Sequence, residues 1–381
     1  MANVLTNLAA DIYVAADVVG RELTGFIPAA TINANGSERV AKGDTVRAAF
    51  TRAASVVDVS EAMTIPEGTD QTVDNKTLSI SNSRAVQIPY TGEDIRHLNN
   101  GVGFETVYGD QIAQAMRALV NEMEADLAEE AYKNASRAFG AAGTTPFASN
   151  FSEVAELRQI LVDNGMPAND GQASLVLNTV AGTNLRQLAQ LQKVNEAGGT
   201  DLLRQGTLLE LQGLSLRESA QVQAHTKGTG SSYLLNDASS AIGDTSIAAD
   251  GGSGTILAGD VVTFNGDTNK YVVNTALSGG SFAIGSPGLR LALADDAAIT
   301  VGNSYTANVA FHRRALEIAM RAPAVPEGGD AADDALTVQD PFSGLVFEIR
   351  VYRGYRKTMI EVAAAWGVKA WKPDFIALLL G

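Results

Sequence analysis

Acidic side chains are the residues of this chain that could most readily do chemistry, because two carboxylates in unlike surroundings can hold different protonation states. Two adjacent pairs occur, Asp295 with Asp296 and Asp333 with Asp334. Both pairs lie in Ala-rich, loop-like sequence with no aromatic residue close by to raise a pKa. We therefore expect solvated loop acids rather than a general acid and a general base.

Metal ligands and nucleophiles are scarce. The chain has no cysteine, and its three histidines, His97, His225 and His312, lie far apart. Four aspartates between residues 244 and 267 could offer oxygen ligands, but their spacing differs from that of a calcium-binding loop. The sequence contains no phosphate-binding loop, zinc-protease helix or serine nucleophile elbow. We expect no enzyme activity, no metal site and no cofactor.

A basic group of residues surrounds a predicted turn between two strands near the end of the chain. Its members are Arg350, Arg353, Arg356 and Lys357. The chain as a whole carries 28 basic and 43 acidic side chains, a net charge of -15. In so acidic a chain, we expect this group to pair with the carboxylates of another subunit rather than to bind nucleic acid.

An acidic group repeats at four-residue steps, which would place its members on one face of a helix. These residues are Glu122, Asp126 and Glu130. We expect a solvated helix face rather than a metal or catalytic cluster, and this face could also meet basic groups of a partner.

Composition and charge exclude several classes of protein. The net negative charge argues against sequence-specific nucleic-acid binding. No apolar run reaches the length of about 18 residues that a membrane helix needs, and Met1–Asn7 lacks the features of a secretory signal. We therefore expect that the protein does not associate with a membrane. We expect it to mature in a reducing cytoplasm.

Elements in the first third of the chain suggest an extended body. Apolar residues at helical spacing predict a helix over Met1–Phe26, and small polar residues predict an unpacked, extended arm over Pro28–Gly43. Alternation predicts strands at Val46–Phe50 and Val86–Tyr90, which we expect to pair as a hairpin. Residues 44–91 would then form a projecting loop, marginal alone because two strands have no covered face.

The strongest helical pattern runs over Phe104–Phe139. Its apolar stripe consists of Ile112, Met116, Leu119, Val120, Met123, Leu127 and Ala131. Mixed helix and strand patterns follow, with helices at Phe151–Asn164 and Asn184–Val194 and a strand at Ala173–Leu177. A Gly-, Ser- and Asp-rich stretch then predicts an inserted all-β module over 223–308, with strands on both sides of a turn at 265–269.

Long strands close the chain. Alternation predicts a pair at Phe347–Val351 and Thr358–Val362 with a turn at Gly354, and Phe375–Leu380 reads as an apolar strand or plug.

This order of elements resembles the major capsid protein of tailed bacteriophages, the Hong Kong phage or Johnson fold. Four short stretches look like the short-tailed phage coat subfamily that carries an inserted β domain: Lys42–Asp44, Leu211–Gly213, Asn308–Arg314 and Trp366–Pro373. The resemblance implies an α+β fold with an N-terminal arm, an extended hairpin loop, a long spine helix, a mixed α/β axial domain and an inserted small β domain. The divisions would be an arm at 1–43, an extended loop at 44–100, a peripheral domain at 101–150 plus 335–381, an axial domain at 151–222 plus 309–334, and the inserted domain at 223–308.

The resemblance also implies a structural role. Relatives self-assemble as pentamers and hexamers into an icosahedral shell around double-stranded DNA, which they hold without sequence-specific binding. A scaffolding protein and a portal would be partners during assembly in the host bacterial cytoplasm, and the mature protein would reside in the virion.

Two alternatives stay open. A bacterial nanocompartment shell shares the fold and encloses enzymes, although its subunits are usually shorter and lack such an insert. A glycan-binding or glycan-processing protein could use the β module and the acid pairs, although aromatic residues make up only 6% of the chain.

Overall fold

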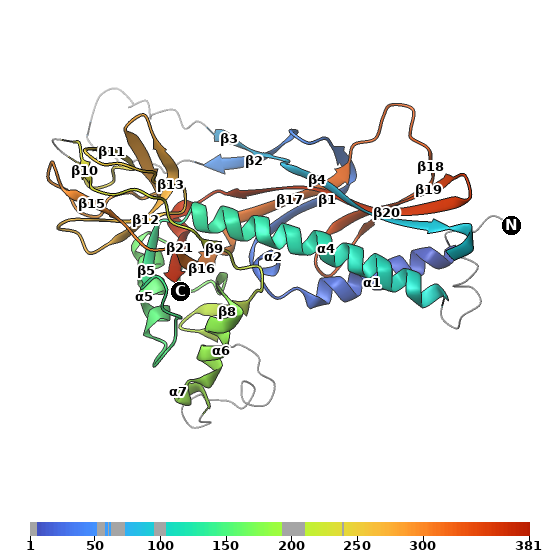
Figure 1. Ribbon diagram of the computed structural model, residues 1–381, viewed down its shortest axis with the longest axis horizontal. Helices are drawn as coiled ribbons and strands as arrows, with labels where there is room; N and C mark the ends of the chain where they lie inside the picture. Colours follow the sequence, from blue (N-terminus) through green and yellow to red (C-terminus); the bar gives the residue numbers. More distant parts are fainter. Residues whose placement is uncertain are drawn as a thin grey trace.

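The computed structural model describes residues 6–51, 58–59, 61, 73–94, 104–192, 210–237 and 240–381. Within these ranges the chain forms two β-sheets and a separate two-stranded ribbon, arranged around the long helix α4 (Phe104–Lys133) (Figure 1). One sheet lies along α4 and the other lies beyond the C-terminal end of this helix. The fold class is α+β, as predicted from the sequence.

The first sheet is six-stranded, and β20 is its central strand. Its order is β1 (Thr31–Val40), β17 (Leu316–Pro323), β20 (Lys357–Ala370), β19 (Val346–Gly354) and β18 (Ala332–Gln339), with β4 (Asn82–Thr91) also on β20. The pairing of β19 with β20 around Gly354 confirms the two long strands predicted near the C-terminal end.

The second sheet is formed by 13 strands of the described chain and has two parts. The part next to α4 contains β5 (Arg137–Gly140), β6 (Ala173–Leu177), β7 (Glu210–Leu211), β8 (Leu214–Glu218), β9 (Ala224–His225), β16 (Tyr305–His312) and β21 (Ile376–Leu380). The other part contains β10 (Tyr233–Leu235), β11 (Ser246–Asp250), β12 (Val261–Phe264), β13 (Lys270–Ser278), β14 (Ser281–Ile284) and β15 (Ala298–Val301).

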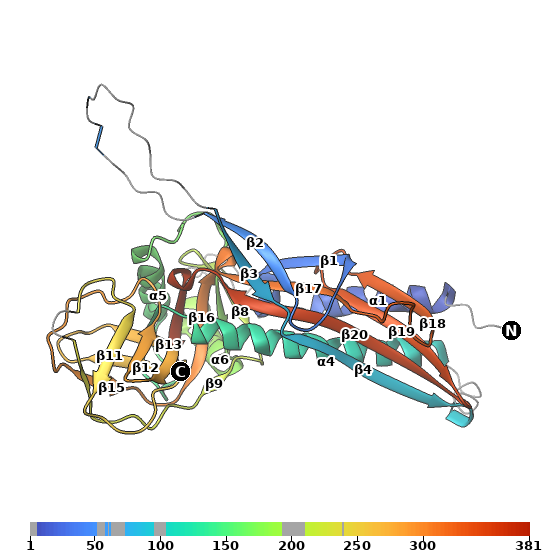
Figure 2. The same cartoon turned by 90° about the horizontal axis from the view of Figure 1, so that it is seen from above.

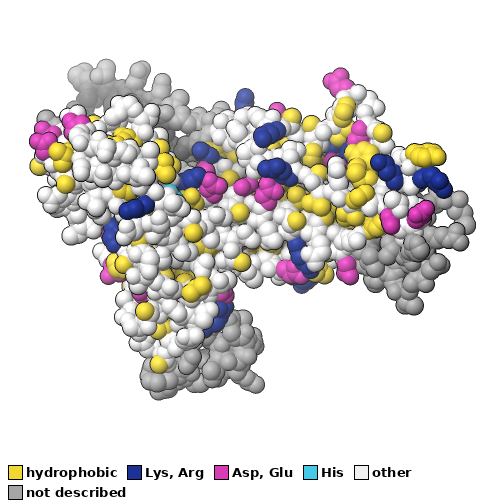
Figure 3. All heavy atoms as spheres, in the orientation of Figure 1, with side chains coloured by type: hydrophobic (Ala, Val, Ile, Leu, Met, Phe, Trp, Pro, Cys, Tyr) yellow, Lys and Arg dark blue, Asp and Glu magenta, His cyan; other side chains and the backbone are white. Residues whose placement is uncertain are grey.

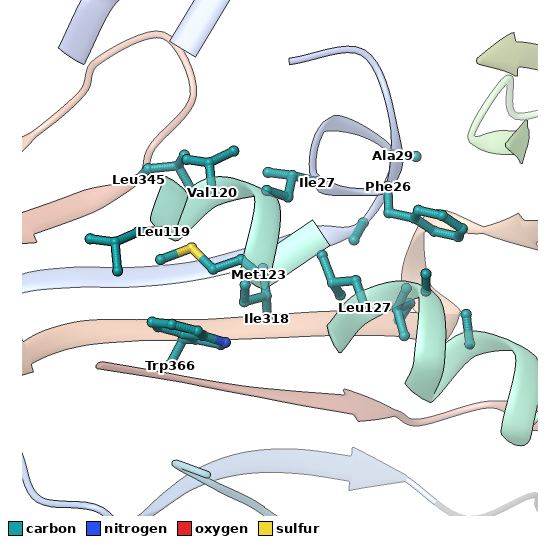
Figure 4. Packing of buried hydrophobic residues seen from close by; sticks show 14 of the residues in the cluster. Phe26, Ile27, Ala29, Leu119, Val120, Met123, Leu127, Ile318, Leu345 and Trp366 are labelled. Atoms are coloured by element: carbon teal, nitrogen blue, oxygen red, sulfur yellow. The ribbon is translucent and has the colours of Figure 1, made fainter. Parts of the chain in front are cut away.

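Helix α4 packs its apolar stripe onto the first sheet, and all seven predicted stripe residues are buried. Figure 4 shows Leu119, Met123 and Leu127 close to Ile318 of β17 and Trp366 of β20. Full burial of each such side chain contributes about 1.5–3 kcal/mol. The helix has 30 residues, so it is about 45 Å long and can serve as a spine.

The predicted end of this helix at Phe139 is wrong. The helix ends at Lys133, and Arg137–Gly140 form β5 instead. Strand β5 pairs in parallel with β21 and antiparallel with β13, so contacts far along the chain outweigh the local helical pattern.

The N-terminal segment is packed rather than free. Helices α1 (Thr6–Glu22) and α2 (Phe26–Ala29) contact α4, and β1 pairs in parallel with β17. The expectation of an unpacked arm over Pro28–Gly43 is therefore wrong for residues 31–40, which are extended but lie in the sheet. Their polar composition suits a strand at the sheet edge, where most side chains are half-buried or exposed.

The predicted hairpin has the wrong partners. Strand β2 (Thr45–Thr51) pairs with β3 (Val73–Ser79), whereas β4 pairs along its whole length with β20. Val86 and Ile88 lie opposite Val362 and Ile360, so β4 places apolar side chains against the core. Strand β3 has no apolar alternation in Val73–Ser79 that would have revealed it.

The predicted β module has its own core. Fifteen buried residues between Tyr233 and Ile299 form one cluster, to which no residue outside the module belongs. Strands β12 and β13 pair across the turn at 265–269, as expected. The module is nevertheless continuous with the other part of the second sheet, because its strand β13 also pairs with β5.

Two segments pair with strands of a different sheet from the one that the predicted domain boundaries imply. Strand β17 lies in the sheet of the spine helix, although 309–334 was expected in the axial domain. Strand β21 lies between β5 and β16 in the second sheet, although 335–381 was expected in the peripheral domain. In both cases the hydrogen bonds are made to strands distant in the sequence.

Three helices lie beside the second sheet: α5 (Ser152–Asp163), α6 (Thr179–Gln187) and α7 (Ala189–Gln192). Leu157 and Leu161 of α5 pack against the buried strands β6 and β21. The helix predicted over Asn184–Val194 thus starts earlier and is divided at Leu188, and residues 193–194 lie outside the described ranges.

Candidate assembly surface

The β2–β3 ribbon projects from the body and has only two strands (Figure 2). Seven residue pairs, from Thr45 with Ser79 to Thr51 with Val73, define its register. A two-stranded ribbon is marginal by itself, because no third strand or helix covers a face. Within the described part of the chain, β2 and β3 pair only with each other.

The base of the ribbon, in contrast, is tightly held. Leu78 and Ile80 are fully buried against Ala319 of β17 and Ala365 of β20. At Gly367 a Cβ atom would lie 2.1 Å from the carbonyl oxygen of Ser79, so only glycine allows this approach. The direction in which the ribbon leaves the body is therefore determined by the first sheet.

Two arginines of the predicted basic group are used within the chain. Arg350 is buried, and its Nε lies 3.0 Å from Glu348, while its Nη1 contacts Asp330. A hydrogen bond from the Ala332 backbone N–H, together with the Tyr352 hydroxyl and Arg350, lowers the pKa of Asp330. Arg353 pairs with Asp333 at 2.8 Å.

Arg356 and Lys357, the other two members of this group, are exposed at the β19–β20 turn. Tyr355 lies beside them, and 90% of its surface is accessible. Arg356 has a φ of 56°, an uncommon conformation for a residue with a Cβ. The turn thus presents an aromatic ring and two cations at one end of the molecule, and tyrosine and arginine are enriched in protein interfaces. The two cations were predicted from the sequence, but the exposed Tyr355 that precedes them was not.

The acidic group on α4 faces the first sheet rather than solvent, so the expectation of a solvated face is wrong. Asp126 accepts hydrogen bonds from Asn82 and from the indole of Trp366. Glu130 accepts one from the Ala370 backbone N–H. Glu122 lies 3.1 Å from Arg84 of β4 in a more exposed pair. Both sides of the helix are covered, which its amphipathic sequence does not reveal.

Helix α1 exposes an apolar face that the sequence analysis missed. Tyr13, Val14 and Val18 are between 40% and 63% accessible. Phe342, in the loop between β18 and β19, is 64% accessible and lies under the guanidinium of Arg21, 5.2 Å from its ring centre. Apolar and charged side chains also alternate over this end of the molecule in Figure 3. Exposed apolar side chains on a well-packed helix mark a surface for protein contacts.

Glu124 joins the spine helix to the N-terminal segment and was also missed. Its carboxylate accepts hydrogen bonds from the backbone N–H groups of Phe26 (2.5 Å) and Ile27 (2.8 Å), at the start of α2. Burial raises the pKa of Glu124 even though these hydrogen bonds oppose the shift. The sequence did carry a signal for this buried carboxylate, because Glu124 is an acidic residue next to the apolar stripe residues Met123 and Leu127.

The remaining candidate groups have structural partners. His225 is buried and bonds Asp260 at 2.8 Å, and His312 bonds Asp170 at 2.8 Å, as expected for packing histidines; His97 lies outside the described residues. Asp295 and Asp296 are exposed. In the described ranges, no three His, Asp or Glu side chains gather as metal ligands would, and no helix has the length and hydropathy of a membrane span.

Comparison with known proteins gives a likeness in structure alone. No family model matches the sequence, and no curated protein does. The capsid structure of the cyanophage P-SCSP1u is similar with a TM-score of 0.51, 12% identity, and coverage of 94% of this chain and 88% of the other. A Mycobacterium phage Che8 structure has 15% identity, coverage of 94% and 91%, and a TM-score of 0.49. The cyanophage likeness shows that the chain has the fold seen in a phage capsid.

Proposed function

We propose that this protein is the major capsid protein of a tailed bacteriophage, which assembles as pentamers and hexamers into an icosahedral shell around double-stranded DNA. The observation that carries the proposal is the combination of the capsid fold with the β2–β3 ribbon. The ribbon is held firmly at its base, and among the described strands β2 and β3 pair only with each other. A neighbouring copy would supply the missing surface.

The exposed side chains support repeated self-association. Tyr355, Arg356 and Lys357 at one end, and the apolar face of α1 with Phe342, offer contact surfaces that the described chain leaves uncovered. Arg353 and Glu122 could exchange their intrachain partners for those of a neighbour, since both lie in exposed pairs. Arg350, Asp126 and Glu130 would act indirectly, by holding the surfaces in place.

The net charge of -15 suits a shell that confines DNA by closure rather than by neutralising its phosphates. A scaffolding protein and a portal would take part in assembly in the host cytoplasm. The inserted module at about 223–308 would add stability or lateral contacts, because its core is separate from those of the two sheets.

Electron microscopy of the purified protein, alone and with a candidate scaffolding protein, tests the proposal. We expect closed icosahedral shells with pentameric and hexameric units. Shells that hold only protein cargo when produced in phage-infected cells would favour a nanocompartment instead. A monodisperse monomer that acts on polysaccharides would favour the glycan-processing alternative.

A further inference from the structure

A cavity of about 300 Å³ lies where the inserted module meets α5. Strand β5 contributes Arg137 to its wall, the turn between β12 and β13 contributes Thr268 and Asn269, and β13 contributes Lys270. Helix α5 contributes Glu156 and Asp163, among other residues. The proposed shell function uses none of these groups.

Arg137 is the central feature of this cavity. Only 6% of the residue is accessible, and its guanidinium donates hydrogen bonds to Asn269 Oδ1 (3.0 Å), Asn164 Oδ1 (3.3 Å) and the Ile160 carbonyl (3.4 Å). Its Nε is buried and has no hydrogen-bond partner in the described part of the chain. A buried donor without an acceptor is costly, so the Arg137 guanidinium is not fully satisfied by the protein groups around it.

The charge of Arg137 is also incompletely balanced. Asp163 is the acidic residue paired with it, but their closest atoms are 3.7 Å apart and the Asp163 side chain is 40% accessible. Burial, and then the nearby positive charge of Arg290, lower the pKa of Arg137. A buried cation is normally balanced by a close, hydrogen-bonded anion. Among the described residues, the anion paired with Arg137 is this loose and partly solvated one.

Lys270 adds a second cation to the same cavity. Its Nζ donates one hydrogen bond to the Gly140 carbonyl, which leaves further ammonium donors for a ligand. Both carboxylates of the cavity, Glu156 and Asp163, come from α5, and Glu156 is half-buried. Both cations, Arg137 and Lys270, come from the strands β5 and β13 on the other side. A negatively charged ligand would therefore bind on the strand side.

We propose that this cavity binds a small oxyanion, a phosphate or carboxylate group, at Arg137 and Lys270. Such a group accepts several hydrogen bonds at once and suits the guanidinium geometry. Because both α5 and the inserted module line the cavity, the bound anion stabilises the position of the module relative to the rest of the second sheet. This site does not depend on the proposed shell function.

Titration calorimetry of the full-length protein with inorganic phosphate and, separately, with succinate tests the proposal. Sodium chloride at matched ionic strength serves as the reference. We expect saturable binding of at least one oxyanion and a saturable rise in Tm. The two arms distinguish a phosphate from a carboxylate ligand. Absence of saturable binding in both arms would overturn the proposal.

Variants separate this site from general salt effects, since phosphate stabilises proteins nonspecifically. Lys270→Gln should weaken binding at least tenfold, whereas Lys227→Gln, at a module lysine that also donates to a single oxygen, should leave it unchanged. Equal binding by both variants would contradict the assignment. Arg137→Lys, which keeps the charge but loses the guanidinium donors, should also weaken binding in protein whose circular dichroism is native.

Discussion

The indole Nε1 of Trp366 donates a hydrogen bond to Asp126 Oδ2 at 2.8 Å, which joins the central strand β20 to the spine helix α4. Trp366 is fully buried, and the same carboxylate oxygen also accepts from Asn82 of β4 at 2.6 Å. One acidic side chain thus ties the helix to two strands. Asp126 therefore stabilises the subunit instead of forming part of a solvated face.

Asp126→Ala should destabilise the folded subunit by about 1–3 kcal/mol, because two buried or half-buried donors lose their acceptor. Asp126→Asn keeps a carbonyl oxygen and should cost less. Urea unfolding followed by tryptophan fluorescence measures both. Asp110→Ala, at an exposed position of the same helix, should change the free energy of unfolding by less than about 0.5 kcal/mol. An equal effect of the two alanine variants would contradict this role of Asp126.

Glu124 should make stability depend on pH. Burial raises its pKa in the folded state, so the folded protein binds a proton that the unfolded chain releases as the pH rises above its ordinary value of 4.5. The free energy of unfolding therefore falls as the pH rises through the folded-state pKa. Arg217 is the charged side chain that opposes this shift.

The difference between wild type and Glu124→Gln isolates this effect, since Gln does not titrate. Unfolding in urea at several pH values between 4 and 8 should show the wild type losing stability relative to the variant as the pH rises. A difference that is constant over this range would show that Glu124 does not titrate in it.

Charge reversal at the exposed turn tests the proposed contact surface. Arg356→Glu combined with Lys357→Glu should slow or abolish shell formation while the subunit stays folded, because attraction to a neighbour becomes repulsion. Light scattering over time follows assembly, and the loss should be larger at low salt. Arg356→Glu and Lys357→Glu are also made singly, and Lys227→Glu, at an exposed lysine of the module, is the matched control for each. Assembly at the wild-type rate would remove this turn from the contact surface.

The inserted module should fold by itself. A fragment of residues 226–303 retains all fifteen residues of its core cluster, but it loses the pairing of β13 with β5 and the hydrogen bonds that Gly259 and Asp260 make with Tyr305 and His225. We expect a β-rich circular dichroism spectrum and a cooperative thermal transition. A spectrum typical of an unfolded chain would show that the second sheet is needed for the module to form.

Local patterns in the sequence predicted the elements whose formation is itself local. The stripe from Ile112 to Ala131 predicted the spine helix because it repeats at helical spacing, and every stripe residue is buried. The turn at Gly354 likewise predicted β19 and β20. The end of the helix at Lys133 was not predictable in this way, because it depends on the pairing of β5 with β21, about 240 residues away.

The candidate surface was less predictable, because it depends on which strands pair and which faces stay uncovered. Val46–Phe50 could have paired with either following segment, and the apolar residues of β4 favoured the wrong partner for β2. Arg350 was grouped with Arg356 in the sequence analysis because both are basic and close in the sequence. In the structure Arg350 is buried in ion pairs, whereas Arg356 is exposed. Composition marks the turns at 340–344 and at Gly354, but it does not reveal that Phe342 and Tyr355 stay exposed there.

A subunit with a shortened ribbon tests whether the ribbon is needed for assembly into shells. Replacing residues 48–76 by Asn-Gly joins Arg47 to Thr77, which face each other in the register, through a two-residue turn. The buried base at Leu78 and Ile80 stays intact. Sedimentation velocity and electron microscopy should show a folded subunit that no longer closes into shells under conditions where the full-length protein does. Shells of normal size from the shortened subunit would show that the ribbon is not needed for assembly.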